Sequence, residues 1–174
     1  MIKLFAISGS IRQFSSNTAL LRAAAILAPQ NVKISIYGDL GNLPHFNPDL
    51  EGFEPPSVID FRSQLQMADG VLIASPEYAH GITGVMKNAL DWVVGSGEFV
   101  HKPVALLNAS FRAIHAQESL REILKTMDAR IVPEASKTIP LPNNKIDETG
   151  IIAHPELSSS LRIAVAALVC SINL

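Results

Sequence analysis

Two loops carry the residues of this chain that are best suited to chemistry: SGSIRQFSSN at 8–17 and SPEYAHGITGVMKNALDW at 75–92. Each loop stands where a short apolar run gives way to a helical pattern. The first is rich in small hydroxyl residues and holds glycine and one arginine, a composition that suits a phosphate group. The second places Pro-Glu-Tyr ahead of a helical pattern, which suits a flat ring. Together the two loops predict a site for a phosphorylated aromatic molecule.

The first of these segments, residues 8–17, is called the phosphate loop below. In a doubly wound sheet, backbone N–H groups and the positive end of the following helix would point at an anion from this position. Ser10, Ser15 and Asn17 can add polar groups, and Arg12 can add a two-pronged, charge-assisted hydrogen bond. The segment has neither the GxxxxGK[ST] pattern of a triphosphate loop nor the GxGxxG dinucleotide fingerprint. The alternative is an ordinary turn between strand and helix, with Asn17 as the helix N-cap.

The start of the second segment, residues 75–83, is called the ring loop. Pro76 fixes a turn, Tyr78 offers a planar wall, and Gly81 lets the backbone approach a ligand closely. We expect Glu77 to hold the loop in shape rather than to act as an acid. The alternative is a plain helix start, with Trp92 in the core. Combined with the phosphate loop, this slot favours flavin mononucleotide (FMN) as the cofactor.

Short apolar runs alternate with longer amphipathic ones along the chain. The apolar runs predict strands over residues 3–8, 33–37, 70–74 and 103–108, with a weaker one within 130–139. The amphipathic runs predict helices over about residues 17–28, 57–68, 82–94, 115–128 and 156–171. Such uniformly apolar runs are typical of parallel strands covered on both faces. The pattern therefore predicts an α/β fold with a doubly wound sheet, in one domain over residues 1–174.

The composition limits the classes of partner. A net charge of −2 and an isoelectric point near 6.2 give no electrostatic reason to expect nucleic acid or an anionic membrane. The apolar run near residues 163–169 is too short to span a bilayer, and the N-terminus runs directly into the first strand. Cys170 is the only cysteine, and the five histidines lack metal-site spacing. We expect a cytoplasmic protein with no metal site.

The two loops resemble the NADPH-dependent FMN reductases, a flavodoxin-like family that includes quinone, azo and chromate reductases. The family pattern GSLRxxSxN is matched by GSIRQFSSN at 9–17, and PEYNxSxPGxLKNAIDW is matched by PEYAHGITGVMKNALDW at 76–92. The stretch DLGNLPHFNPDLE at 39–51 is also similar to the family. Two departures from the pattern matter for the site: Ala79 replaces an asparagine and Thr83 replaces a proline. These changes could remove a side-chain contact with the flavin edge.

The resemblance implies a flavodoxin-like, five-stranded parallel sheet with helices on both faces. It also implies an enzyme that passes hydride from NADPH or NADH through bound FMN to a small acceptor: a quinone, an azo compound, a metal oxyanion or free flavin. Such a reaction requires no catalytic acid or nucleophile, and none is assigned. The family also implies a homodimer or homotetramer, to which the apolar segments 82–94 and 95–100 could contribute.

A third loop, NASFRAIHAQ at 108–117, should by resemblance border the pyrimidine end of the flavin, with Ser110 or Arg112 as contacts. For Arg112, an ordinary surface position is the alternative. The candidate cofactor-binding residues are Ser10, Arg12, Ser15, Asn17, Thr18, Pro76, Glu77, Tyr78, Ala79, Gly81, Ser110 and Arg112. Two other functions stay open, an electron carrier that binds FMN and a binding module that has lost it. The near-neutral charge and the few aromatic residues favour an enzyme over a carrier.

Overall fold

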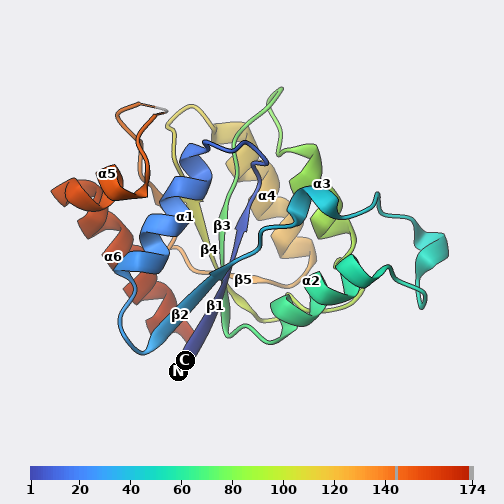
Figure 1. Cartoon of the computed structure of the whole chain (residues 1–174). Helices are drawn as coiled ribbons and strands as arrows, with labels where there is room; N and C mark the ends of the chain where they lie inside the picture. Colours follow the sequence, from blue (N-terminus) through green and yellow to red (C-terminus); the bar gives the residue numbers. More distant parts are fainter. Residues whose placement is uncertain (144, 173–174) are drawn as a thin grey trace.

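The computed structural model describes residues 1–143 and 145–172, and a parallel sheet forms its centre (Figure 1). The strand order is β2–β1–β3–β4–β5, and β6 also pairs with β4. The strands are β1 (Ile2–Ser8), β2 (Val32–Ile36), β3 (Gly70–Ala74), β4 (Pro103–Asn108), β5 (Arg130–Ile131) and β6 (Lys137–Thr138). The α-helices are α1 (Ser16–Leu27), α2 (Pro56–Gln66), α3 (Gly84–Asp91), α4 (Ile114–Thr126), α5 (Glu148–Ala153) and α6 (Pro155–Ile172). This topology confirms the predicted doubly wound, flavodoxin-like fold.

Alternate residues of the central strands face two separate apolar cores. Leu4 and Ala6 of β1 belong to a core that also holds buried residues of α1, α5 and α6. Phe5 and Ile7 belong to a second core with residues of α2, α3 and α4. In Figure 1 these two sets of helices cover opposite faces of the sheet. Since both faces are covered, the central strands β1, β3 and β4 are apolar at nearly every position, which is why the sequence pattern located them well.

The expected count of five strands is wrong, because the described residues form six. The position beside β4 is shared by β5 and β6, which pair with Pro103–Val104 and with Leu107–Asn108 respectively. Between them, the backbone N–H of Leu106 donates to Ser136 Oγ at 3.1 Å instead of to a strand carbonyl. Pro133 lies in the same interval and has no N–H to donate. The edge strand is therefore interrupted rather than continuous.

The helices lie close to their predicted positions, with two differences. α3 ends at Asp91, short of the predicted residue 94. α5 was not predicted, because six residues are too few for a clear helical period. Its N-cap is Asp147, whose side chain accepts a hydrogen bond from Gly150 N.

Helix α6 is long and apolar enough, by length and composition alone, to cross a membrane. In the fold it is a packing element, because Leu161, Ala164 and Leu168 are fully buried in the core shared with α1 and β4. The apolar run at 163–169 lies within this helix: Ala164, Val165 and Leu168 face the core, whereas Ile163 is exposed.

The strand order brings the three sequence-predicted loops to one edge of the sheet. Ser8 pairs with Ala74, and Ala74 pairs with Leu107, so β1, β3 and β4 end side by side. The connections reverse direction between β2 and β3, on either side of β1. In a doubly wound sheet this reversal opens a crevice for a ligand beyond the carboxyl ends of the strands.

Candidate functional site

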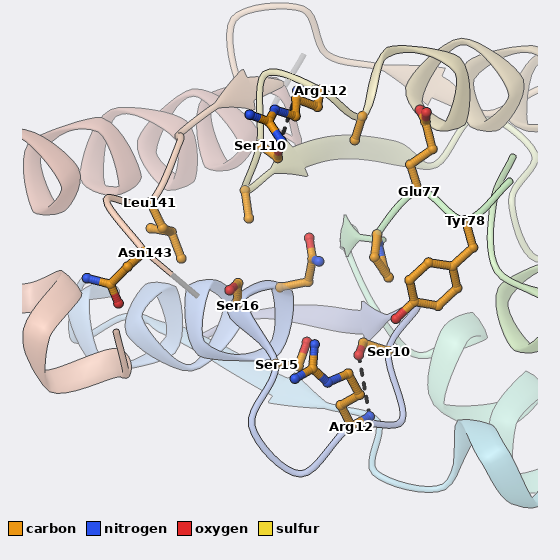
Figure 2. Close-up of a pocket in the computed structure, with 14 residues that line it drawn as sticks. Ser10, Arg12, Ser15, Ser16, Glu77, Tyr78, Ser110, Arg112, Leu141 and Asn143 are labelled. Carbon is orange, nitrogen blue, oxygen red and sulfur yellow. Dashed lines mark hydrogen bonds between the residues drawn. The ribbon is translucent and has the colours of Figure 1, made fainter. Parts of the chain in front are cut away.

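A cavity of about 420 Å³ opens at this edge, between the loops that follow β1, β3 and β4 (Figure 2). This volume lies within the usual range of cofactor sites. Its walls are Ser10, Arg12, Ser15, Ser16, Asn17, Pro76, Glu77, Tyr78, Ala109, Ser110, Arg112, Ala113, Leu141 and Asn143. Nine of the predicted cofactor-binding residues are therefore brought together: Ser10, Arg12, Ser15, Asn17, Pro76, Glu77, Tyr78, Ser110 and Arg112. Thr18, Ala79 and Gly81 do not line this cavity.

The phosphate loop is held in place by α1. Ser15 is the N-cap of the helix, and its Oγ accepts a hydrogen bond from Thr18 N at 3.3 Å. Asn17 is therefore not the N-cap, so the alternative role for this residue is wrong. Thr18 turns toward the strand, where its Oγ1 lies 2.7 Å from Ser8 Oγ. This hydrogen bond explains why Thr18 supports the phosphate loop rather than lining the cavity of about 420 Å³.

Gly9 is where the phosphate loop crosses the start of the ring loop. A Cβ atom at this position would lie 2.2 Å from Ser75 Oγ and 2.7 Å from Ser75 Cβ, which is too close for any side chain. Gly9 N donates to Ala74 O at 2.8 Å, and Gly9 O accepts from Thr83 Oγ1 at 2.7 Å. Thr83 is also the N-cap of α3 and accepts from Met86 N. The threonine that departs from the family pattern thus joins the two loops.

Asn17 provides a test of whether the cavity suits FMN. The residue is 7% exposed and lines the cavity, and its Oδ1 atom has no hydrogen-bond partner in the part of the chain described. A buried acceptor without a partner is costly, so such an atom indicates a donor supplied by a ligand. The ribityl hydroxyls of FMN are donors of this kind, and the amide's NH₂ group can donate to a phosphate. The residues present therefore fit the cofactor.

The ring loop ends in a tight turn. Tyr78 N donates to Gly81 O at 3.1 Å, and Gly81 N donates to Tyr78 O at 3.0 Å. Between them, Ala79 and His80 have φ angles of 49° and 58°, in the left-handed region that asparagine and glycine adopt most easily. Ala79 and Gly81 therefore shape the turn instead of facing the cavity. The family's asparagine would suit the backbone conformation found at position 79.

Glu77 has the structural role predicted for it. Its Oε2 accepts a hydrogen bond from Ala116 N at 2.9 Å, in the first turn of α4. A carboxylate at this end of a helix is stabilised by unpaired N–H groups and the helix dipole. Tyr78, next along the chain, is 54% exposed, so its ring forms an outer wall of the cavity. The ring loop is thus fixed at Glu77 and open to solvent at Tyr78.

The third loop repeats a local motif of the phosphate loop. Ser110 Oγ accepts from Arg112 N at 3.1 Å, as Ser10 Oγ accepts from Arg12 N at 3.4 Å. In Figure 2 the two arginines lie on opposite sides of the cavity. Glu77 is the single carboxylate among the lining residues, and one of its oxygens is already bonded. The wall therefore carries an excess of positive charge, which suits an anionic ligand.

Five lining residues were not predicted from the sequence: Ser16, Ala109, Ala113, Leu141 and Asn143. Leu141 and Asn143 come from the segment after β6. This segment is held at the cavity because Ile139 N donates to Asn108 O at 2.7 Å and Leu141 N donates to Ala109 O at 3.2 Å. No motif in the sequence marks that contact. Ser16 and Ala109 could have been found, because each is adjacent to a predicted residue or segment.

The histidine in the ring loop stands outside the cavity. His80 stacks on His115, with ring centroids 4.4 Å apart and an interplanar angle of 27°. Across residues 1–143 and 145–172, no three His, Cys, Asp or Glu side chains are grouped to hold a metal ion.

Comparison with known proteins supports the assignment made from this geometry. A family model described as NADPH-dependent FMN reductase matches residues 2–141. An NAD(P)H-dependent FMN reductase of Pseudomonas aeruginosa is 38% identical over 86% of this chain and 83% of its own. A 2-hydroxy-1,4-benzoquinone reductase of a Burkholderia species is 32% identical over 92% of this chain and 91% of its own.

Among solved structures, the fold is similar to FerB of Paracoccus denitrificans, a flavoenzyme NAD(P)H:(acceptor) oxidoreductase. The two chains superpose with a TM-score of 0.81 and 26% sequence identity, covering 99% of this chain and 98% of FerB. The three-loop cavity, the buried Asn17 Oδ1 that finds no hydrogen-bond partner among the described residues, and these relatives agree with one another. The chain belongs to the NADPH-dependent FMN reductase family and is an oxidoreductase that uses FMN and NAD(P)H.

Proposed function

We propose that the cavity between the three loops binds FMN and that the protein transfers two electrons from NAD(P)H to a small quinone. The observation that carries this proposal is the convergence of nine predicted residues on one cavity of about 420 Å³. The relatives named above include a reductase of a benzoquinone and an FMN reductase. When bound, FMN supplies the redox chemistry by accepting hydride from NAD(P)H and passing electrons to the acceptor.

The phosphate loop binds the charged end of the cofactor. Ser16 and Asn17 lie in the first turn of α1, where backbone N–H groups lack intrahelical partners and the helix dipole favours an anion. Arg12 and the hydroxyl of Ser10 add donors from the same loop. Asn17 Oδ1 accepts from a ribityl hydroxyl and so orients the chain that leads to the ring.

The other two loops position the ring. Pro76 and Tyr78 form one wall, and Glu77 keeps that wall in place through its bond to α4. Ser110 and Arg112 form the opposite wall, where the guanidinium would stabilise negative charge on a bound ring. None of these residues has to move a proton. The chain's contribution is to bind, orient and stabilise charge.

The exposed side of the cavity admits the acceptor. Tyr78 is half-exposed, and Arg112 and Phe111 are exposed on the facing loop. A planar quinone can approach through this opening and stack on a bound ring. An electron carrier would instead need a charged face for a protein partner, whereas the net charge of the chain is only −2.

The test is an absorbance spectrum after the protein has been incubated with FMN and desalted. We expect flavin bands to be retained, to bleach when NADPH or NADH is added without oxygen, and to return when 1,4-benzoquinone is added. Retained bands that neither nucleotide bleaches would indicate a carrier. Failure to retain or titrate FMN would overturn the proposal.

The protein is also proposed to be a cytoplasmic homo-oligomer, with a homodimer as the simplest case. Large apolar side chains are exposed on the loops that border the cavity: Ile11, Phe14, Tyr78, Phe111 and Ile114. Of the segments 82–94 and 95–100, only Val94 and Val100 are exposed large hydrophobic residues among those described. The loops around the cavity are therefore the better candidate for the contact. Light scattering coupled to size exclusion tests the proposal, and a monomeric mass at micromolar concentration would exclude it.

A further inference from the structure

A second cavity, of about 600 Å³, lies on the other side of the phosphate loop, between that loop, α1 and the end of β2. It is lined by Ser8, Ser10, Ile11, Arg12, Gln13, Thr18, Arg22, Ile36, Tyr37, Gly38, Leu40, Gly41 and Asn42. Ser10 and Arg12 also line the cofactor cavity, so the two spaces are neighbours. The proposed flavin site makes no use of the rest of this cavity.

The charge on its wall favours an anion. Arg12 and Arg22 both line it, and no lining residue carries a carboxylate. The nearby Asp39 is outside the lining, and its Oδ1 accepts a hydrogen bond from Asn42 Nδ2 at 3.1 Å. Arg12 is assigned above to the cofactor phosphate, so Arg22 is the guanidinium left to provide a charge-assisted, two-pronged donor to a phosphate in this cavity.

Arg22 is the residue free to respond to such a ligand. Its one ion pair in the described part of the chain is with Glu148 of α5, where Nη1 and Oε2 are 3.9 Å apart. The two side chains are 50% and 31% exposed, so this pair contributes little stability. A phosphate in the cavity would offer Arg22 a stronger, two-pronged partner.

The remaining walls suit the nucleoside part of such a ligand. Gln13 and Asn42 offer amide groups, while Ile11, Ile36 and Leu40 offer apolar surface. The Tyr37 hydroxyl already donates to Ser57 O at 3.3 Å, and burial, aided by Asp60 and Asp39, raises the pKa of this phenol. Tyr37 therefore stays neutral and adds no negative charge to the wall. In dinucleotide-binding folds with the GxGxxG fingerprint, an adenosine ribose binds near the end of the second strand. This chain lacks that fingerprint, so it is the charge and the lining of the cavity that favour a nucleotide here.

We propose that this second cavity binds the phosphorylated adenosine end of NADPH, with Arg22 contacting the ribose 2′-phosphate and so favouring NADPH over NADH. The inference rests on the proposed function, because a nicotinamide placed at the cofactor cavity must leave the rest of its nucleotide nearby. The shared residues Ser10 and Arg12 make the second cavity the adjoining space. NADH lacks the 2′-phosphate and gains nothing from Arg22.

The test compares the FMN-loaded wild type with Arg22→Gln, using two measurements. The first is the ratio of kcat/KM for NADPH to that for NADH, which should fall about tenfold when a charge-assisted contact is lost. The second is calorimetric titration with 2′,5′-ADP and with 5′-AMP. In the wild type 2′,5′-ADP should bind about tenfold more tightly than 5′-AMP, and in Arg22→Gln this advantage should disappear.

Two further variants separate phosphate binding from an effect on the fold. Glu148→Gln removes the partner of Arg22 but keeps the guanidinium, so it should maintain or increase the preference for NADPH. Arg121→Gln removes an arginine of α4 that lines neither cavity, and its ratio should match that of the wild type. If Arg22→Gln and Glu148→Gln both lower the ratio equally, Arg22 acts by holding α5 and the proposal is wrong.

The failures of the two proposals are distinguishable. If the FMN-loaded protein oxidises neither nucleotide, the proposed function fails, and the titrations still decide whether the cavity prefers a 2′-phosphate. If the nucleotides are oxidised but 2′,5′-ADP and 5′-AMP bind equally to the wild type, the function stands and the second cavity is not the phosphate subsite.

Discussion

The phosphate loop and the ring loop lie side by side but are held in different ways. In the phosphate loop, Ser15 and Asn17 are buried and the backbone is tied to α1 and β3. In the ring loop, residues 78–80 are exposed, and two of them adopt left-handed backbone angles. The two ends of the phosphate loop are thus held by buried contacts, although residues 11–14 between them are exposed, whereas the turn of the ring loop is exposed throughout. This difference explains how alanine can occupy position 79 while the glycine at position 9 has no substitute.

The largest effect should come from replacing Gly9 with alanine. The new Cβ would collide with Ser75, which belongs to the start of the ring loop, so both loops must shift. We expect a loss of about 2–3 kcal/mol in unfolding free energy, typical of overpacking. Chemical denaturation would measure this loss, and fluorescence titration should show much weaker FMN binding. Gly84→Ala is the control, because a Cβ there meets nothing within 4 Å. Equal unfolding free energies for the two variants would show that the contact between Gly9 and Ser75 has room for a side chain.

Thr83→Val should have the next largest effect, because it removes the link between the loops while keeping the side-chain shape. The variant loses the bond to Gly9 O and the cap of α3. Together these cost about 1–2 kcal/mol of stability. Thr83→Ser keeps the hydroxyl and should lie within about 0.5 kcal/mol of the wild type. If the serine variant is as unstable as the valine variant, the methyl group and not the hydroxyl is what matters.

Asn17→Ala should weaken cofactor binding without weakening the fold. The Oδ1 atom has no partner within the described protein, so its removal costs the apoprotein no hydrogen bond through that atom. The Kd for FMN should rise about tenfold, the loss expected for one buried hydrogen bond. Fluorescence quenching measures the Kd, and thermal unfolding of the apoprotein should give an unchanged Tm. Asn31→Ala, at the amino end of β2, should alter neither quantity. A clear drop in apoprotein Tm for Asn17→Ala would assign the amide a structural role.

The smallest effect is expected in the ring loop. Ala79→Asn should stabilise the protein by about 0.5 kcal/mol, because asparagine adopts a positive φ more easily than alanine. Differential scanning calorimetry can resolve the small rise in Tm. The matched change Ala28→Asn, at a φ of −62°, should bring no such gain. A fall in stability for Ala79→Asn would mean that the exposed turn is more closely packed than its surroundings indicate.

Local patterns were sufficient for much of the fold, and nine of the twelve candidate cofactor-binding residues line one cavity. Strands β3 and β4 begin and end where the apolar runs predicted, because strands covered on both faces are apolar throughout. Local sequence patterns gave no indication of features that depend on a hydrogen bond between residues far apart in the chain. Thr18 is a candidate cofactor contact, yet it does not line the cofactor cavity, and its Oγ1 lies 2.7 Å from Ser8 Oγ. The two-part edge strand depends on Ser136 accepting from Leu106, which no local period reveals.

The sequence by itself determined which chemical groups the site can offer. The hydroxyls, the amides, the arginine in each of two loops and the Pro-Glu-Tyr turn all belong to short segments, which can be read without the fold. The sequence also determined the doubly wound fold, since hydrophobic period and segment length are local. Only the tertiary structure decided which polar atoms are already satisfied. In the fold, the hydroxyl of Thr18 hydrogen-bonds with that of Ser8, and the amide oxygen of Asn17 has no partner among the described residues. The fold also brings Arg22 to a second cavity beside Arg12. Hydrogen-bond partners far apart in the chain are fixed by packing, and they decide which residues remain free for a ligand.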